Sequence, residues 1–127
     1  MEYLREREVL WLSLILSVIG IIFLAYGSTL VEPKKADIKD LEELEGVYVS
    51  VTGRVLDVIS SKGNLFLKIE DRTGDVNVVI FEREMKRMGL ESNDIRKGMV
   101  LVVEGVVQRY RGEVEVIPES ITILESA

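Results

Sequence analysis

A long uncharged stretch near the amino terminus constrains this chain more than any other feature. From Val9 to Val31 the sequence has no Lys, Arg, Asp or Glu over 23 residues, and a bilayer-spanning helix needs about 20 apolar residues. As an α-helix the stretch would be about 34 Å long, enough to cross a hydrocarbon core of about 30 Å. Tyr3, Trp11 and Tyr26 lie near its ends, where aromatic rings favour the headgroup layer. We therefore expect residues 9–31 to be a transmembrane helix in the lipid bilayer.

A cleavable signal peptide and a buried core helix are the two alternatives for this stretch. The charged start, with Arg5 and Arg7, and the small residues Ala25, Gly27 and Ser28 fit a signal peptide. The apolar run, however, exceeds the roughly 7–15 residues of a signal core. Core helices are usually shorter and amphipathic. These lengths favour a retained single-pass anchor in a cell membrane.

The composition excludes several kinds of chemistry. The chain contains no Cys and no His, which rules out disulfides, thiolate catalysis, imidazole bases and the usual zinc sites. Glu70, Asp71 and Asp75 gather near one turn, but their spacing is not that of a calcium loop, and turns commonly use Asp. No nucleophile–base pair or phosphate-cradling Gly-rich loop is visible. We expect no metal, no cofactor and no enzymatic activity. The Glu-rich, amide-poor composition is typical of thermophiles.

The distribution of charge limits the kind of partner that the chain can bind. The net charge is −6; residues 1–46 contribute −4 and residues 47–127 contribute −2. A strongly basic surface, which polyanion binding usually needs, is missing. The flanks of the apolar stretch carry Arg5 and Arg7 on one side and Lys34, Lys35 and Lys39 on the other. The positive-inside rule therefore gives only a slight preference for a cytoplasmic carboxyl-terminal domain.

Four segments follow one another along the chain. We expect a charged tail (1–8), the transmembrane helix (9–31), an acidic linker (32–46) and a globular domain (47–127). In the linker, Ile38, Leu41 and Leu44 recur every three residues, which favours one or two helical turns lying on the domain.

The domain is predicted to be mainly β. Alternating apolar and polar residues, punctuated by glycines, are typical of half-buried strands. Gly53 suggests a bulge or sharp bend in the first strand, and Arg111–Gly112 suggests a hairpin between the last two. The expected strands are Val47–Ile59, Leu65–Glu70, Asp75–Phe81, Met99–Tyr110 and Glu113–Leu124, with a helix over Phe81–Met88 that ends at Gly89. Three strands, a helix and a closing hairpin fit a five-stranded, partly open OB-fold barrel.

Four segments resemble OB-fold nucleic-acid-binding domains of the tRNA-anticodon-binding type. Those domains have a V-x-G-x-V first strand, an F-x-L-x-D-x-T-G turn and a K-G-x-x-V-x-V-x-G fourth strand. The matching segments here are VYVSVTGRV, FLKIEDRTGDVNVVIF, IRKGMVLVVEGVV and YRGEVEVIPESITIL, all within residues 47–127. The resemblance implies the fold and a single-stranded DNA or RNA ligand.

OB barrels bind ligands over their second and third strands, between the first and last hairpin loops. Aromatic rings there stack on bases while Lys and Arg neutralise phosphates. The alternatives are that Phe66 is covered by the linker and that Tyr110 lies at an ordinary solvated hairpin tip. The candidate nucleic-acid-binding residues are Lys62, Phe66, Lys68, Asn77, Arg109, Tyr110 and Arg111, with Val79 beside them.

Two functions from different classes follow. The first is a membrane-anchored OB-fold protein that binds single-stranded nucleic acid weakly. The second is a membrane-tethered module, exposed outside the cytoplasm, whose barrel docks a protein partner. A tethered OB domain is also similar to the haem chaperones of cytochrome c maturation, but those attach haem through a His or a Cys, and this chain has neither.

Overall fold

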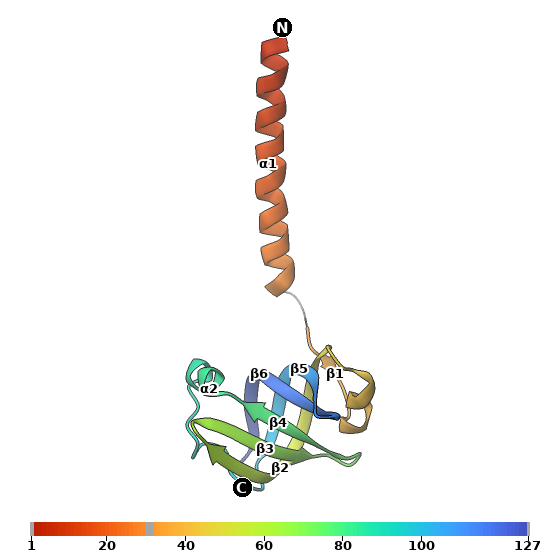
Figure 1. Ribbon diagram of the computed structural model, residues 1–127, viewed down its shortest axis with the longest axis vertical. Helices are drawn as coiled ribbons and strands as arrows, with labels where there is room; N and C mark the ends of the chain where they lie inside the picture. Colours follow the sequence, from red (N-terminus) through yellow and green to blue (C-terminus); the bar gives the residue numbers. More distant parts are fainter. Residues whose placement is uncertain (1, 30–31, 127) are drawn as a thin grey trace. The chain divides into compact units, whose positions relative to one another are not determined.

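The computed structural model describes residues 2–29 and 32–126, which divide into two compact units, Met1–Glu32 and Pro33–Ala127. The first unit is helix α1, Glu2–Thr29 (Figure 1). Its segment Arg5–Gly27 is long and apolar enough to cross a membrane, and none of it is buried. Leu30 and Val31, the last residues of the predicted 9–31 segment, lie outside the described residues.

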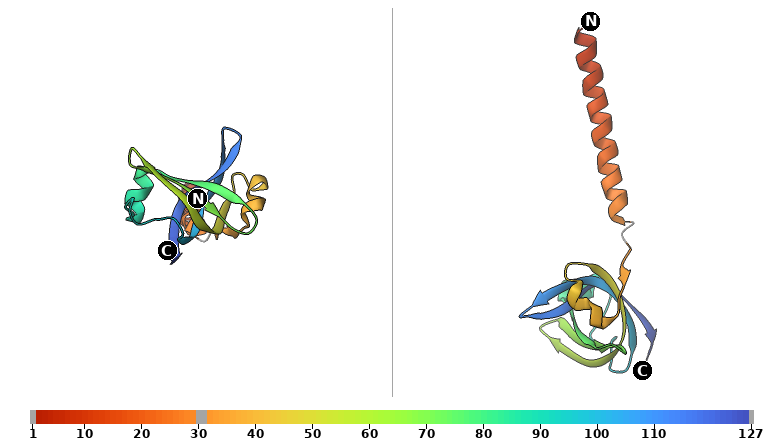
Figure 2. Two further views of the ribbon diagram at one scale, coloured as in Figure 1. Left: turned by 90° about the horizontal axis from the view of Figure 1, so that it is seen from below. Right: turned by 90° about the vertical axis from the view of Figure 1, so that its right-hand side faces the viewer.

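The second unit is a β-barrel of the OB type, as predicted. Its strands follow the order β1-β2-β3-β4-β6-β5, in which β1 is the short strand Lys34–Lys35, and β2 also pairs with β5, which closes the sheet on itself (Figures 1 and 2). The β4–β6 pair is parallel, whereas the other pairs among the long strands are antiparallel. The long strands are β2 (Tyr48–Ser61), β3 (Asn64–Glu70), β4 (Asp75–Ile80), β5 (Val100–Tyr110) and β6 (Glu113–Glu125).

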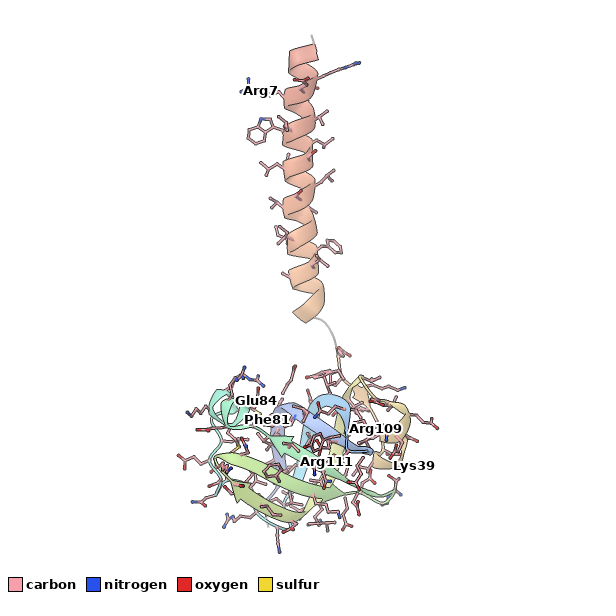
Figure 3. All side chains as sticks on the ribbon, viewed as in Figure 1. Arg7, Lys39, Phe81, Glu84, Arg109 and Arg111 are labelled. Atoms are coloured by element: carbon pink, nitrogen blue, oxygen red, sulfur yellow. The ribbon has the colours of Figure 1, made fainter. Side chains whose placement is uncertain are left out.

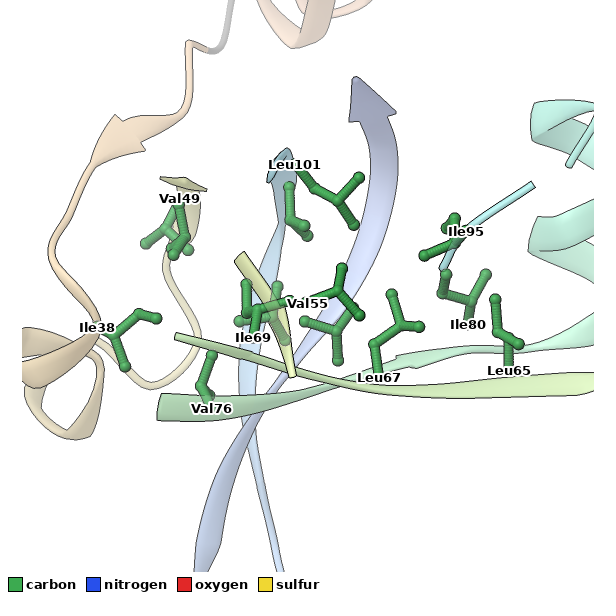
Figure 4. Close-up of a cluster of buried hydrophobic side chains, with 14 of the residues drawn as sticks. Ile38, Val49, Val55, Leu65, Leu67, Ile69, Val76, Ile80, Ile95 and Leu101 are labelled. Carbon is green, nitrogen blue, oxygen red and sulfur yellow. The ribbon is translucent and has the colours of Figure 1, made fainter. Parts of the chain in front are cut away.

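The barrel interior is filled by aliphatic side chains from alternate strand positions (Figure 4). In β3, Leu65, Leu67 and Ile69 point inward and are buried, while the residues between them are exposed. In the described part of the chain no polar or charged residue is buried. The strict alternation explains why the strand pattern could be recognised from the sequence, because successive side chains of a strand face opposite sides.

The irregularity in β2 falls at Leu56 rather than at Gly53. Val55 pairs with Ile69 and Asp57 pairs with Lys68, so Leu56 is the extra residue of a β-bulge. Gly53 meets a different need: a Cβ atom there would lie 2.9 Å from the carbonyl oxygen of Glu70. The predicted position of the bulge was therefore wrong, and the glycine instead permits β3 to approach β2 closely.

Two tight turns join neighbouring strands. Lys62 and Gly63, between β2 and β3, have φ angles of 53° and 82°, and Arg111 and Gly112, between β5 and β6, have 52° and 83°. Positive φ at both central residues is the backbone of a type I′ hairpin. Helix α2 (Glu82–Met88) follows β4 and ends at Gly89 in the left-handed conformation, as predicted.

Residues 34–43 are folded onto the barrel. Strand β1 (Lys34–Lys35) pairs in parallel with β2, and a 3-10 helix, η1 (Ile38–Glu43), follows. Ile38 and Leu41 are buried in the same core as the strands, and Leu44 is partly buried against it. The helical turns expected from the spacing of these three residues are present.

Candidate nucleic-acid interface

A groove of about 300 Å³ runs along the outer surface of β3 and β4. It is formed by the outward-facing residues of these strands, because the inward-facing ones fill the core. Residues of β2 and β6 complete its walls. The lining side chains available to contact a ligand are those of Asp57, Ile59, Phe66, Lys68, Asn77 and Glu115.

One row of the groove is apolar. Phe66 of β3 pairs with Ile59 of β2 on one side and with Val79 of β4 on the other. Val79 is buried, whereas Phe66 is 38% exposed and Ile59 56% exposed. An aromatic side chain that is partly open to solvent therefore lies between aliphatic side chains of the two neighbouring strands. Such a ring can stack on a nucleic-acid base, a contact worth about 1–3 kcal/mol per base.

The adjacent row is polar. Lys68 pairs with Asp57 on one side and with Asn77 on the other, and Asn77 pairs in turn with Glu115 of β6. An ammonium, an amide and a carboxylate offer both donors and acceptors to the edge of a base. The row contains two carboxylates and one ammonium, although Lys97 lies 3.7 Å from Asp57 and neutralises it in part. The groove suits a base better than it suits a row of phosphates.

Of the predicted site residues, the structure brings Phe66, Lys68 and Asn77 together in this groove, with Val79 beside them. Lys62 is exposed on the β2–β3 turn and does not line the groove. Phe66, for which coverage by the linker was the alternative, is 38% exposed, and no described residue of the linker lines the groove around it.

Tyr110 and Arg111 lie at the tip of the β5–β6 hairpin. Tyr110 is 54% exposed, and the Arg111 guanidinium carbon lies 5.3 Å from the centre of its ring, within cation–π range. Neither residue lines the groove over β3 and β4. The hairpin tip is thus a second surface on which an aromatic ring and a cation occur together.

Arg109 is engaged with the protein itself. Its Nη2 donates to Glu42 at 2.9 Å and its Nε donates to Glu45 at 3.3 Å, while Nη1 donates to the Gly112 carbonyl at 2.8 Å. These two carboxylates, first Glu42 and then Glu45, raise the pKa of Arg109 above its ordinary value. Arg109 therefore joins the hairpin to η1 rather than pointing freely to solvent.

Sequence reasoning missed Asp57, Ile59 and Glu115. Without a bulge, alternation from the buried Val55 would turn Asp57 and Ile59 inward. The extra residue at Leu56 reverses the phase, so both residues face outward and line the groove. Glu115 enters through the parallel β4–β6 pairing, which joins strands far apart in the sequence. The alternation of Glu113 and Glu115 with Val114 and Val116 was the available sign that Glu115 faces outward.

The D-x-T-G turn between β3 and β4 has a structural task. Asp71 accepts hydrogen bonds from the backbone N–H groups of Ile38, Thr73 and Gly74 and from the Thr73 hydroxyl. Thr73 Oγ1 accepts another from the Lys39 N–H, at 3.0 Å. Burial alone would raise the pKa of Asp71, but these hydrogen bonds hold it below the ordinary value of 3.8. The turn therefore fastens the start of η1 to the barrel.

Comparison with known proteins agrees with this geometry. A family model described as an OB-fold nucleic acid binding domain, of the tRNA anti-codon type, matches residues 49–124. That match covers more than half of the chain. The protein belongs to the family of OB-fold nucleic-acid-binding domains.

In individual relatives the matching segment is a small part of a larger protein. The chain is 34% identical over 96 residues to an aspartate–tRNA(Asp/Asn) ligase of Archaeoglobus fulgidus, covering 72% of this chain and 22% of the ligase. Asparaginyl-tRNA synthetase from Pyrococcus horikoshii shares the fold with a TM-score of 0.62 and 24% identity, over 74% of this chain and 23% of the synthetase. The chain thus spans about a fifth of the curated relative that it matches.

A protein that is matched over nearly its whole length is also similar. An OBody solved bound to hen egg-white lysozyme has a TM-score of 0.62 and 25% identity, over 76% of this chain and 98% of the OBody.

Proposed function

We propose that this protein is a membrane-anchored OB-fold domain that binds single-stranded nucleic acid weakly through the groove over β3 and β4. The activity named for the aspartate–tRNA ligase belongs to that whole protein. For this chain we propose binding alone, without catalysis.

The observation that carries the proposal is the exposed ring of Phe66 beside Lys68 and Asn77. The three side chains come from neighbouring strands whose cross-strand register fixes their spacing. A base can stack on the ring while its edge meets the ammonium and the amide. Both strands also build the aliphatic core, so the arrangement is held rigidly.

The expected affinity is low because of charge. Single-strand binding draws much of its free energy from phosphate neutralisation, which requires several Lys or Arg contacts. The groove supplies Lys68 against Asp57 and Glu115. Binding that rests on stacking should therefore depend less on salt than that of a basic OB domain.

Fluorescence anisotropy with labelled DNA and RNA of about 8–12 nucleotides tests the proposal on the full chain in zwitterionic nanodiscs. At about 50 mM salt we expect measurable binding of single strands and weaker binding of the duplex. F66A should weaken binding about tenfold, the equivalent of one lost stacking contact. F81A is the matched control, since Phe81 is 44% exposed but lies beside α2, outside the groove. The proposal fails if no single strand binds, or if both variants behave alike.

Membrane anchoring is a second part of the proposal, supported by the length and composition of α1. The described side chains of α1 are all exposed, from Arg5 to Gly27, so their apolar surface needs a non-aqueous environment. We propose a single-pass protein of the cell membrane with its barrel in the cytoplasm, where nucleic acid is available. Protease digestion of sealed vesicles tests the orientation: the barrel should be degraded in inside-out vesicles and protected in right-side-out ones.

The acidic rim of the groove favours a second candidate, a protein-docking module. Glu70 and Asp75 flank the polar row, and Glu113 follows at the hairpin, so this surface also suits a cationic protein. The OBody shows that a similar domain can bind a protein, lysozyme. Protection of the barrel in inside-out vesicles, together with absence of oligonucleotide binding, would favour this candidate over the first.

A further inference from the structure

The η1 segment presents a concentrated negative charge at one side of the barrel. Residues 36–46 contain five acidic side chains and one basic one. They are held in place by the buried side chains of Ile38 and Leu41 and by the hydrogen bonds that the Ile38 and Lys39 N–H groups donate to Asp71 and Thr73. At the other end of the segment, the Gly46 N–H donates to the Val107 carbonyl at 2.7 Å. These carboxylates are therefore presented from an ordered turn.

Two of these carboxylates, on Glu42 and Glu45, bind the guanidinium of Arg109 in the β5–β6 hairpin. Glu42 and Glu45 each take one donor of Arg109, and the Gly112 carbonyl takes a third. Arg111, two residues on, has no ion-pair partner among residues 2–29 and 32–126 and lies over Tyr110. Figure 3 shows Arg109 and Arg111 on the side of the barrel that carries Lys39 of η1, away from Phe81 and Glu84.

Carboxylate and phosphate groups present similar pairs of oxygens to a guanidinium, and both form charge-assisted hydrogen bonds with it. We infer that Glu42 and Glu45 are an intramolecular counter-ligand, which occupies Arg109 in place of a nucleic-acid phosphate and lowers the affinity of the hairpin for single strands. This inference rests on the proposed function. It assigns to Glu42 and Glu45, which precede the long strands, a regulatory role at the β5–β6 hairpin, which is a second contact surface for the same nucleic-acid strand.

The pair of variants E42Q/E45Q and D40N/E43Q tests the inference on the full chain in nanodiscs. Both variants remove two negative charges from the same turns, but the ion pairs of Arg109 are with Glu42 and Glu45, not with Asp40 or Glu43. Freed Arg109 should add one phosphate contact, which steepens the slope of log K against log salt by about 0.7. At about 50 mM salt this corresponds to a five- to tenfold tighter complex. D40N/E43Q should change the dissociation constant by much less.

A third variant, R109Q in the E42Q/E45Q background, should abolish the gain. Circular dichroism melting of each variant verifies that the barrel is folded. Equal gains in the two double variants, or a gain that survives R109Q, would overturn the inference while leaving the proposed function intact. Binding by E42Q/E45Q where the wild type shows none would support it. Absence of binding by every variant would remove the proposed function and the inference together.

Discussion

The two units of this protein place their apolar side chains in opposite ways. In α1, Phe23 and Leu24 are each 77% exposed, whereas the barrel buries Leu67 and Ile69 almost completely. The barrel is stable in water because its apolar surface is internal; the described part of α1 has no such interior. The two units therefore require different solvents, although the second unit also exposes aromatic rings, at Phe66, Phe81 and Tyr110.

The substitution that we expect to destabilise the barrel most, without changing α1, is G105A. A Cβ at Gly105 would collide with the backbone of Ile117 and Pro118 on β6, and overpacking against backbone costs about 3 kcal/mol. We expect a large fall in the melting temperature of the β signal and unchanged partition into detergent. G74A is the control, because its nearest neighbour is Ile38 Cγ2 at an ordinary 3.7 Å. Equal melting of the two variants would contradict the closeness of β5 and β6.

I19R tests the other unit. A charge near the centre of a spanning helix costs about 3 kcal/mol on insertion scales. We expect the variant to be extracted from membranes by alkaline carbonate while its barrel melts as in the wild type. I19L, which keeps the apolar surface, should stay in the membrane fraction. Retention of I19R would argue that α1 does not lie in lipid.

Asp71 gives a prediction with a defined pH dependence. Its pKa is lower in the folded protein than its ordinary value of 3.8, so its stabilising effect is present above that pH and is lost as the pH falls through the folded pKa. D71N replaces the oxygen that accepts from the Ile38 N–H by a donor, and we expect a loss of about 2 kcal/mol at neutral pH. Urea unfolding at neutral pH and below the ordinary pKa measures both effects. The difference between wild type and variant should shrink in acid; a constant difference would refute the role of the ionised carboxylate.

Arg109 should give the smallest change in stability. Its ion pairs with Glu42 and Glu45 are largely exposed to solvent, and such pairs contribute little. The melting temperature of R109Q should be slightly below that of the wild type. Added salt should reduce this difference in melting temperature, because it screens the ion pairs. R54Q is a comparison, since Arg54 also joins an exposed ion pair, with Glu125. A loss of stability as large as that of D71N would mean that Arg109 is required for the stability of the fold and does not act only on the charge of the surface.

The fold was largely readable from the sequence, and the site only in part. Apolar and polar residues alternate so regularly in the strands that the buried face of β3, formed by Leu65, Leu67 and Ile69, could be predicted from the sequence. Phe66, Lys68 and Asn77 followed from the same alternation. Ile59 and Asp57 did not, because one bulged residue, Leu56, reverses the phase of β2. The ion pair of Arg109 with Glu42 joins residues that are 67 positions apart, and no local sequence pattern predicts such a contact.

The chain contains three phenylalanines, and these allow one measurement to test the central claim. Phe23 lies in α1, Phe66 in the groove and Phe81 next to α2. In full-length protein with fluorinated phenylalanine in nanodiscs, a spin-labelled lipid should broaden the Phe23 fluorine resonance most strongly. A single-stranded oligonucleotide should shift the Phe66 resonance and leave Phe81 unchanged. A Phe23 signal insensitive to the lipid label, or a Phe66 signal insensitive to saturating oligonucleotide, would contradict the account.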